Sequence, residues 1–152
     1  MVINLSNFMR YSLMHNEKEM VSFSRELDNI KLYLSIEKVR FGKKLNAEFE
    51  IDAHCMEAEI PNMILQPLFE NAIKYGVYET TEQVTIKTSC ECDGNLLKIL
   101  IVNDYDASTI KRRGEGIGLR NIRKRMEIIY NQPDLIKITD HKTSFEVQLI
   151  IP

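Results

Sequence analysis

The spacing of hydrophobic residues predicts three helices in the first half of the chain. Near the start, apolar residues recur every three or four positions, the spacing of an amphipathic helix, at Val2, Leu5, Met9 and Leu13. A second helix is expected from Ser24, a capping residue, to Gly42, because glycine commonly follows a helix end. Helical spacing returns over residues 60–77, where Pro67 lacks a backbone donor and should kink the helix or delay its start.

Strict alternation of apolar and polar residues predicts a half-buried strand at residues 45–51. Further strands are expected at 83–89, 96–103, 135–139 and 144–151. Asp93 and Gly94 suit a hairpin turn. The polar stretch 104–116 predicts a loop, and a helix should follow over 117–130. This order favours an α/β (α+β) two-layer sandwich, in which helices cover one face of a mixed β-sheet.

The composition is that of an ordinary folded protein and narrows the classes of function. The chain has 152 residues and a mass of 17.7 kDa, with 44% hydrophobic and 28% charged residues, which suits one domain with some attached helix. No apolar run is long enough to span a membrane. Lys and Arg total 20 against 22 Asp and Glu, so the net charge of −2 gives no reason to expect nucleic-acid binding.

The cysteines indicate a compartment more than a site. Cys55, Cys90 and Cys92 are odd in number and lack the paired spacing of a zinc ribbon, which predicts free thiols in a reducing cytosol. The alternative is a Cys-x-Cys metal site completed by His54 or His141.

Three of the six glycines fall within five residues, directly before the predicted helix at 117–130: Gly114, Gly116 and Gly118. Glycines let backbone amides approach a bound group, and unpaired amides at a helix start attract phosphate oxygens, so this segment is a candidate phosphate loop. Leu119 and Arg120 stand where a Walker loop needs Lys and Ser or Thr, and the G-x-G-x-G spacing differs from a dinucleotide fingerprint. A glycine-rich helix entry without a ligand is the alternative.

A second candidate site lies on the predicted helix at 68–76, which carries three polar residues among apolar ones. Glu70 and Lys74 are one turn apart and able to pair as a solvated ion pair. Asn71 adjoins the apolar face, where an amide without partners is costly to bury. Its partner is expected to be either Mg²⁺ with phosphate oxygens or an ordinary backbone group.

The third candidate lies at the end of the strand at 96–103. If Lys98 marks the solvent face, alternation places Asn103 on the inner side, where its amide could hydrogen-bond a heterocycle. Asp104 would then point the other way, and it remains the alternative. Both residues are also common at ordinary strand ends and turns.

Four segments, taken together and in order, resemble a known family: LSNFMRYSL (5–13), LDNIKLYLSIEKVRF (27–41), IPNMILQPLFENAIKYG (60–76) and GIGLRNIRKRM (116–126). They are similar to the LytS/YehU class of bacterial sensor histidine kinases, within the GHKL (Bergerat-fold) ATPases. The resemblance implies that residues 21–152 form the ATP-binding catalytic domain with the Bergerat fold. It also implies that residues 1–20 are the end of the preceding dimerisation and phosphoacceptor helices.

The same resemblance implies roles for single residues and implies ATP and Mg²⁺ as cofactors. Asn71 takes the place of the asparagine that coordinates the Mg²⁺ bridging the ATP phosphates, and Lys74 and Tyr75 fall where the family contacts phosphate and ribose or adenine. Asn103 or Asp104 takes the place of the aspartate that receives the adenine amino group. The box whose backbone amides approach the phosphates corresponds to Gly114, Gly116, Gly118 and the helix start at Leu119. Asn71 and Lys74 would then be the catalytic residues.

The sequence departs from the family pattern at three points. The adenine motif Asp-x-Gly has no glycine here, since the segment reads IVNDYDAS (101–108). Pro67 stands one turn before Asn71, where many relatives carry a polar residue that includes the general base of the hydrolysing members. The Pro-His-Phe motif that carries the phosphoacceptor histidine is absent, and His15, His54 and His141 are predicted to be surface residues.

The implied function is transfer of the ATP γ-phosphoryl group to a histidine on an upstream segment, for relay to a response regulator. The implied partners are therefore a response regulator and the protein's own dimerisation and phosphoacceptor domain, in a homodimer. The chain would be a cytoplasmic part of a larger inner-membrane sensor, and alone it should not phosphorylate itself. The alternatives are a nucleotide-binding signalling module without catalysis, or a GHKL protein-serine kinase or ATPase.

Overall fold

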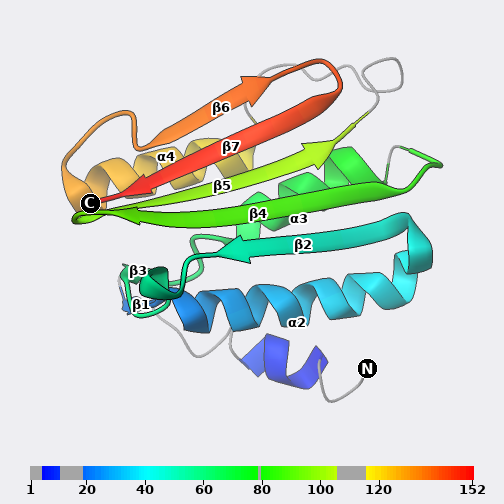
Figure 1. Cartoon of the computed structure of the whole chain (residues 1–152), viewed down its shortest axis with the longest axis horizontal. Helices are drawn as coiled ribbons and strands as arrows, with labels where there is room; N and C mark the ends of the chain where they lie inside the picture. Colours follow the sequence, from blue (N-terminus) through cyan, green and yellow to red (C-terminus); the bar gives the residue numbers. More distant parts are fainter. Residues whose placement is uncertain (1–4, 11–18, 79, 106–115) are drawn as a thin grey trace.

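The computed structural model describes residues 5–10, 19–78, 80–105 and 116–152 (Figure 1). After a short helix at 5–10, the elements are β1 (Met20–Ser22), α2 (Phe23–Phe41), η1 (Gly42–Lys44), β2 (Leu45–Ile51), η2 (Ala53–Cys55), β3 (Glu59–Pro61), α3 (Gln66–Ala72), η3 (Ile73–Val77), β4 (Val84–Asp93), β5 (Leu96–Asp104), α4 (Ile117–Tyr130), β6 (Ile136–Asp140) and β7 (Ser144–Ile151). Within the described ranges, no helix is both long and apolar enough to cross a membrane.

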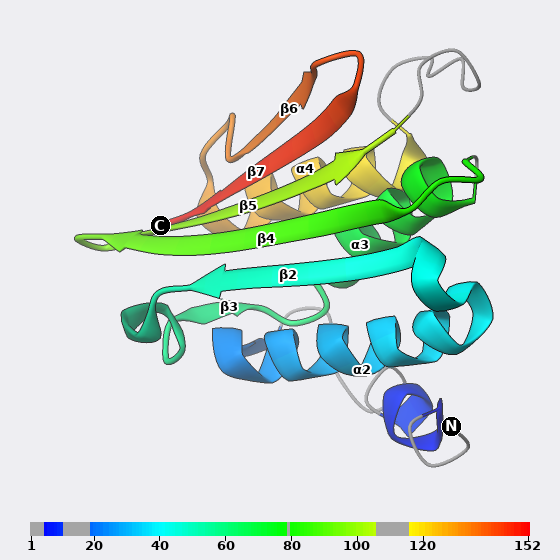
Figure 2. The same ribbon diagram turned by 45° about the vertical axis from the view of Figure 1, so that its right-hand side comes forward.

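One mixed sheet contains five strands in the order β2-β4-β5-β7-β6. β2 and β4 pair in parallel, and the other neighbours pair antiparallel. Figures 1 and 2 show α3 and α4 behind the sheet and α2 running along its β2 edge. The predicted two-layer sandwich with a mixed sheet is therefore confirmed.

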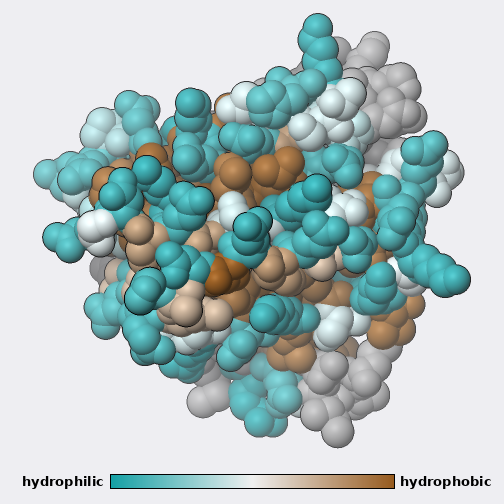
Figure 3. Space-filling model, viewed as in Figure 1, coloured by the Kyte–Doolittle hydropathy of each residue, from teal (hydrophilic) through white to brown (hydrophobic). Residues whose placement is uncertain are grey.

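Alternation along the strands separates a core face from a solvent face. On β5 the residues on the helix side are buried, and they are Leu97, Ile99, Ile101 and Asn103. The three hydrophobic residues of this set belong to one core cluster with side chains from α2, α3 and α4, including Phe23, Leu27, Ile30, Leu68, Phe69, Ile122 and Met126. On the opposite face, turned to the viewer in Figure 3, many hydrophilic side chains lie among exposed hydrophobic ones. One buried face and one solvated face are what the strand alternation predicts.

The second helix starts earlier than predicted. Ser22, rather than Ser24, is its N-cap, and the Ser22 hydroxyl accepts a hydrogen bond from the backbone N–H of Arg25 at 3.3 Å. The residues just before α2 form β1, which the sequence did not predict and which pairs antiparallel with β3. The predicted helix end is confirmed, since Gly42 follows α2 with a φ of +56°.

The helical spacing over 60–77 overestimates the helix at its start, and of the two predicted effects of Pro67 the delayed start is confirmed, because α3 begins only at Gln66. Pro67 lies in its first turn, where a missing backbone N–H removes no helical hydrogen bond. The preceding residues Glu59–Pro61 form β3 instead. From Ile73 the helix continues as the π-helix η3, a form that often occurs at functional sites.

The other predicted elements lie close to their expected ranges. α4 spans residues 117–130 as predicted, while β4 reaches Asp93 and β5 reaches Asp104. The two strands are joined by a tight turn in which Gly94 has a φ of +62°, a conformation that favours glycine. Most of the predicted loop at 104–116 lies outside the described residues.

Candidate functional site

The π-helix η3 brings the end of the ENAIKYG motif toward the end of the sheet. The backbone N–H of Tyr78 closes the wide turn by donating to the carbonyl of Ile73 at 3.1 Å. Tyr78 is held from α2: its hydroxyl accepts from the guanidinium of Arg40, and its ring meets Phe41 edge-on with centroids 5.0 Å apart. Arg40 and Phe41, at the end of α2, therefore hold the end of η3 in place.

Gly76 lies against the last residues of β5. A Cβ atom at this position would be 3.0 Å from Asn103 Nδ2 and 3.2 Å from both the carbonyl oxygen of Asp104 and a methyl group of Val84. No side chain fits there without a shift. Gly76 is thus a site residue that the sequence analysis missed; its only signal was its place at the end of the motif.

Asn103 and Asp104 point in opposite directions, as the alternation predicts. Asn103 is buried, with 2% of its surface exposed, and its Nδ2 donates to the carbonyl of Asp104 at 3.2 Å. The Asp104 side chain is exposed. Of these two side chains, only that of Asn103 lies on the helix side of the sheet, next to Gly76.

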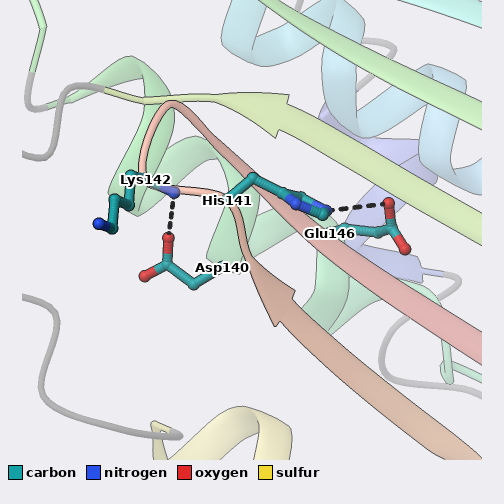
Figure 4. Close-up of polar contacts among 4 residues, drawn as sticks. All are labelled: Asp140, His141, Lys142 and Glu146. Atoms are coloured by element: carbon teal, nitrogen blue, oxygen red, sulfur yellow. Dashed lines mark hydrogen bonds and ion pairs between the residues drawn. The ribbon is translucent and has the colours of Figure 1, made fainter.

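Tyr105, a second residue that the sequence analysis missed, fixes the chain just after β5. Its backbone N–H donates to Thr143 at 3.0 Å, and its hydroxyl donates to the carboxylate of Asp140. The same carboxylate accepts from the backbone N–H of Lys142 at 2.8 Å (Figure 4). One aspartate therefore organises the β6–β7 turn and holds Tyr105. The two contacts of Tyr105 join residues more than thirty positions apart in the sequence, so no local pattern could indicate them.

Two histidines lie on the surface, as predicted. His141 points away from Asp140 in Figure 4; half of its side chain is exposed, and its Nε2 lies 3.5 Å from a carboxylate oxygen of Glu146. His54 is exposed on η2. His15 lies outside the described residues.

The start of α4 approaches η3 and α3. Gly116 is the N-cap and has no side chain to cap the helix, so the first amides of α4 have no partner within the helix. A Cβ at Gly116 would lie 3.9 Å from the Tyr75 hydroxyl oxygen, and one at Gly118 would lie 4.0 Å from Cβ of Pro67. Leu119 is buried with 3% exposed, so its side chain belongs to the core. Gly114 lies outside the described residues.

Asn71 is half-buried on α3, midway between Pro67 and Tyr75 in the sequence. In the part of the chain that the structure describes, its side-chain amide makes no hydrogen bond, so it keeps its capacity to meet a ligand. Glu70 accepts from Gln66 Nε2 at 3.1 Å, and Lys74 Nζ lies 5.3 Å from the centre of the Tyr75 ring. No ion pair between Glu70 and Lys74 occurs among the described residues, because Lys74 already lies in the wider π turn.

Three groups of residues therefore meet at one end of the sheet. Asn103 lies against Gly76, the Tyr75 hydroxyl lies near Gly116 at the start of α4, and Pro67, four residues before Asn71 on α3, lies near Gly118. The free amides of a helix start suit phosphate oxygens, and an amide oxygen such as that of Asn71 can share a Mg²⁺ ion with them. The residues present thus fit a nucleotide with a divalent cation.

The cysteines form a separate cluster at the opposite end of β4. Cys55 lies close enough to Cys90 and Cys92 for the three to influence one another, and all three are free thiols as predicted. Burial raises the pKa of Cys55 to about 11 and raises the pKa of Cys90 as well. Over the described ranges, no three His, Cys, Asp or Glu side chains are grouped to hold a metal ion, so the metal alternative with His54 or His141 is wrong there.

Comparisons with known proteins give sequence relatives along the whole chain. The family model described as "Histidine kinase" matches residues 1–45. The sensor histidine kinase YpdA of Escherichia coli is 31% identical over 141 residues, covering 87% of this chain and 25% of the relative. The sensor histidine kinase YesM of Bacillus subtilis is 29% identical and covers 100% of this chain and 27% of the relative. The sensor protein LytS of Oceanobacillus iheyensis is 26% identical and covers 99% and 28%, respectively. The chain thus spans about a quarter of the length of these relatives.

Solved structures of histidine kinases are similar to this chain in fold. The histidine kinase AdeS of Acinetobacter baumannii has a TM-score of 0.64 at 15% identity, covering 99% of this chain and 75% of that chain. The catalytic domain of histidine kinase ThkA has a TM-score of 0.60 at 15% identity and covers 88% of this chain and 97% of that one. By sequence, then, the chain is a relative of the LytS, YesM and YpdA sensor histidine kinases, and its fold is that of histidine kinase catalytic domains.

Proposed function

We propose that the chain is the ATP-binding catalytic unit of a sensor histidine kinase, which transfers the γ-phosphoryl group of Mg·ATP to a histidine for relay to a response regulator. The single observation that carries the proposal is the meeting of three motifs at one end of the sheet. Asn71 with Lys74 and Tyr75, Asn103 with Gly76, and the glycines at the start of α4 come from separate parts of the sequence. The named histidine kinase relatives support the same function.

The residues divide between the two ends of a nucleotide. Asn103 is the proposed contact for the adenine amino group, since its buried amide lies beside Gly76 and Asp104 points outward. Tyr75 and Lys74 are proposed to contact the ribose and phosphate region. Asn71 is proposed to ligate Mg²⁺, and the phosphates would lie at the backbone amides of Gly114, Gly116, Gly118 and Leu119.

Phosphoryl transfer requires the protein mainly to position the reactants and to neutralise charge, rather than to form a covalent bond with the substrate. When bound, ATP supplies the transferred phosphoryl group and Mg²⁺ neutralises phosphate charge. The exposed ammonium of Lys74 adds positive charge beside Tyr75, and the amides at the start of α4 donate hydrogen bonds without any reorganisation. Asn71, held on α3, would keep the metal in line with these amides.

The decisive experiment is binding of a non-hydrolysable ATP analogue with and without Mg²⁺, measured by calorimetry on the wild-type chain and on Asn71→Ala. We expect Mg²⁺-dependent binding that drops on the order of 10-fold or more in Asn71→Ala, as for loss of a group in a metal site. Asn95→Ala is the matched control, because Asn95 is an exposed asparagine in the β4–β5 turn at the other end of the sheet. Unchanged binding by Asn71→Ala would remove Asn71 from the metal site.

The partners and the setting are part of the same proposal. A structure of ThkA in complex with the response regulator TrrA has a TM-score of 0.63 with this chain at 15% identity, and it covers 99% of this chain and 48% of that one. We propose a response regulator as the partner here too, with a homodimer formed through dimerisation and phosphoacceptor helices. Residues 1–20 would belong to those helices and residues 21–152 to the catalytic domain, as the cytoplasmic part of a membrane sensor.

The rival without catalysis is a module that only binds nucleotide, suggested by the missing Asp-x-Gly motif. The kinase and the inactive module are distinguished by an experiment in which the chain and Mg·ATP are added to a protein that carries the upstream helices. Phosphohistidine on the added protein supports the kinase. Binding of Mg·ATP without any phosphohistidine would favour the inactive module.

A further inference from the structure

Glu26 is a fully buried carboxylate outside the site described above. It lies on α2 with 0% of its surface exposed. Its Oε1 accepts from the backbone N–H of Met63 at 2.8 Å, and its Oε2 accepts from the backbone N–H of Leu65 at 3.3 Å. A carboxylate is costly to bury unless charged hydrogen bonds compensate, and these two bonds do so. The burial of this charged group therefore indicates a specific structural role for Glu26.

The two amides belong to the segment that starts α3, residues 62–65. Leu65 is the N-cap residue of α3, and it supplies no side-chain hydrogen bond to the helix. Met63 has a φ of +59°, which is uncommon for a residue other than glycine, so contacts from outside the segment must hold it. Glu26 provides them and caps α3 from a different helix, with its negative charge at the favourable N-terminal end.

The same segment is also held from the other side by α4. Nη2 of Arg125 donates to the carbonyl oxygen of Asn62 at 2.6 Å. α4 begins at the glycines of the proposed phosphate site, and Pro67 approaches Gly118 there. Contacts from α2 and α4 thus fix where α3 starts relative to the glycines.

We infer that Glu26 is a positioning residue for the metal and phosphate end of the site, an inference that rests on the proposed function. Asn71 lies six residues beyond Leu65 on the helix that Glu26 caps, about 9 Å along the helix axis. A small shift at the start of α3 therefore moves Asn71 against the amides of α4. The adenine end is held separately, because Asn103 lies on β5 and the end of η3 is fixed by Arg40 and Phe41.

The test is the variant Glu26→Gln, which keeps the shape of the side chain but replaces the charged acceptor by an amide. Its affinity for a Mg-bound ATP analogue should fall on the order of 10-fold, the lower end of the loss seen when a partner of a metal ligand is removed. Its affinity for adenosine, which has no phosphate, should stay within about 2-fold, a change of less than 0.5 kcal/mol. Amide hydrogen exchange without nucleotide should become faster over 62–72 and stay unchanged over 96–103.

Two further variants keep the result interpretable. Glu50→Gln is the matched control, because Glu50 is exposed on β2 and should change neither affinity. Arg125→Met loosens the same segment from α4, and it should reproduce the selective loss even if Glu26→Gln folds poorly. Two outcomes would overturn the inference: an equal loss of affinity for the Mg-bound ATP analogue and for adenosine in Glu26→Gln and Arg125→Met, or no loss of affinity in either variant.

The proposed function fails in a different way. A wild-type chain that binds adenosine but shows no Mg²⁺-dependent binding of the analogue would refute the proposed function, and the inference with it.

Discussion

Replacing Gly76 by alanine tests the close approach between η3 and β5. The φ angle of Gly76 is not positive, so the glycine is required by lack of space rather than by backbone conformation. The added methyl group would lie 3.0 Å from Asn103 Nδ2 and 3.2 Å from the backbone oxygen of Asp104. Asn103 is buried and Asp104 contributes backbone atoms, so neither can move at low cost. Overpacking of this kind costs about 1–3 kcal/mol, against a gain of up to about 1 kcal/mol from the better helix propensity of alanine.

The net expectation for Gly76→Ala is a loss of about 1–2 kcal/mol in the free energy of unfolding, measured by urea denaturation, with a fall in melting temperature of about 2–8 °C. Affinity for adenosine should fall as well, because Asn103 has to shift. Gly118→Ala is the control. Among the described residues its methyl group would meet Cβ of Pro67 alone, at an ordinary 4.0 Å, so this variant should be as stable as the wild type or slightly more stable. A Gly76→Ala chain with wild-type stability and wild-type affinity for adenosine would refute the packing argument.

Three further predictions follow from single contacts. Asn103→Ala should lower the affinity for adenosine on the order of 10-fold, while Asp104→Ala should change it by less than about 2-fold. Calorimetry that shows the larger loss in Asp104→Ala would assign the base contact to Asp104. Tyr105→Phe removes the hydrogen bond to Asp140 and should lower the free energy of unfolding in urea by about 1 kcal/mol, whereas an unchanged value would mean that this bond adds nothing in solution. Burial raises the pKa of Cys55 to about 11, so the folded chain keeps a proton that the unfolded chain loses near pH 8.5, and stability should fall between about pH 8.5 and pH 11. The same titration on Cys55→Ala should show a smaller fall, and identical slopes for the two chains would contradict the assignment.

The elements that the sequence predicted well are those decided by local spacing. The range of α4 and the side of the sheet that carries Asn103 both follow from the hydrophobic period, which is local information. The late start of α3 follows from Pro67, as predicted, but the strand that replaces the first residues of the expected helix was not predicted: Glu59–Pro61 pairs with β1, almost forty residues earlier in the chain, and no local pattern reports such a partner. The predicted ion pair of Glu70 and Lys74 assumed regular helical spacing, and the π-helix removes it.

The missing glycine of the Asp-x-Gly motif gains a physical explanation when both sides of the β5 end are considered. A glycine is required where two backbones come close, and here that position is Gly76, on the helix side of Asn103. If Asn103 takes the first place of the motif, Tyr105 takes the place of its glycine. Tyr105 is buried and tied to Asp140, so the chain after β5 is held by a side chain rather than left to adopt an unusual backbone conformation. The departure from the motif therefore changes how the end of the strand is anchored, and it leaves the space beside Asn103 to be set by Gly76.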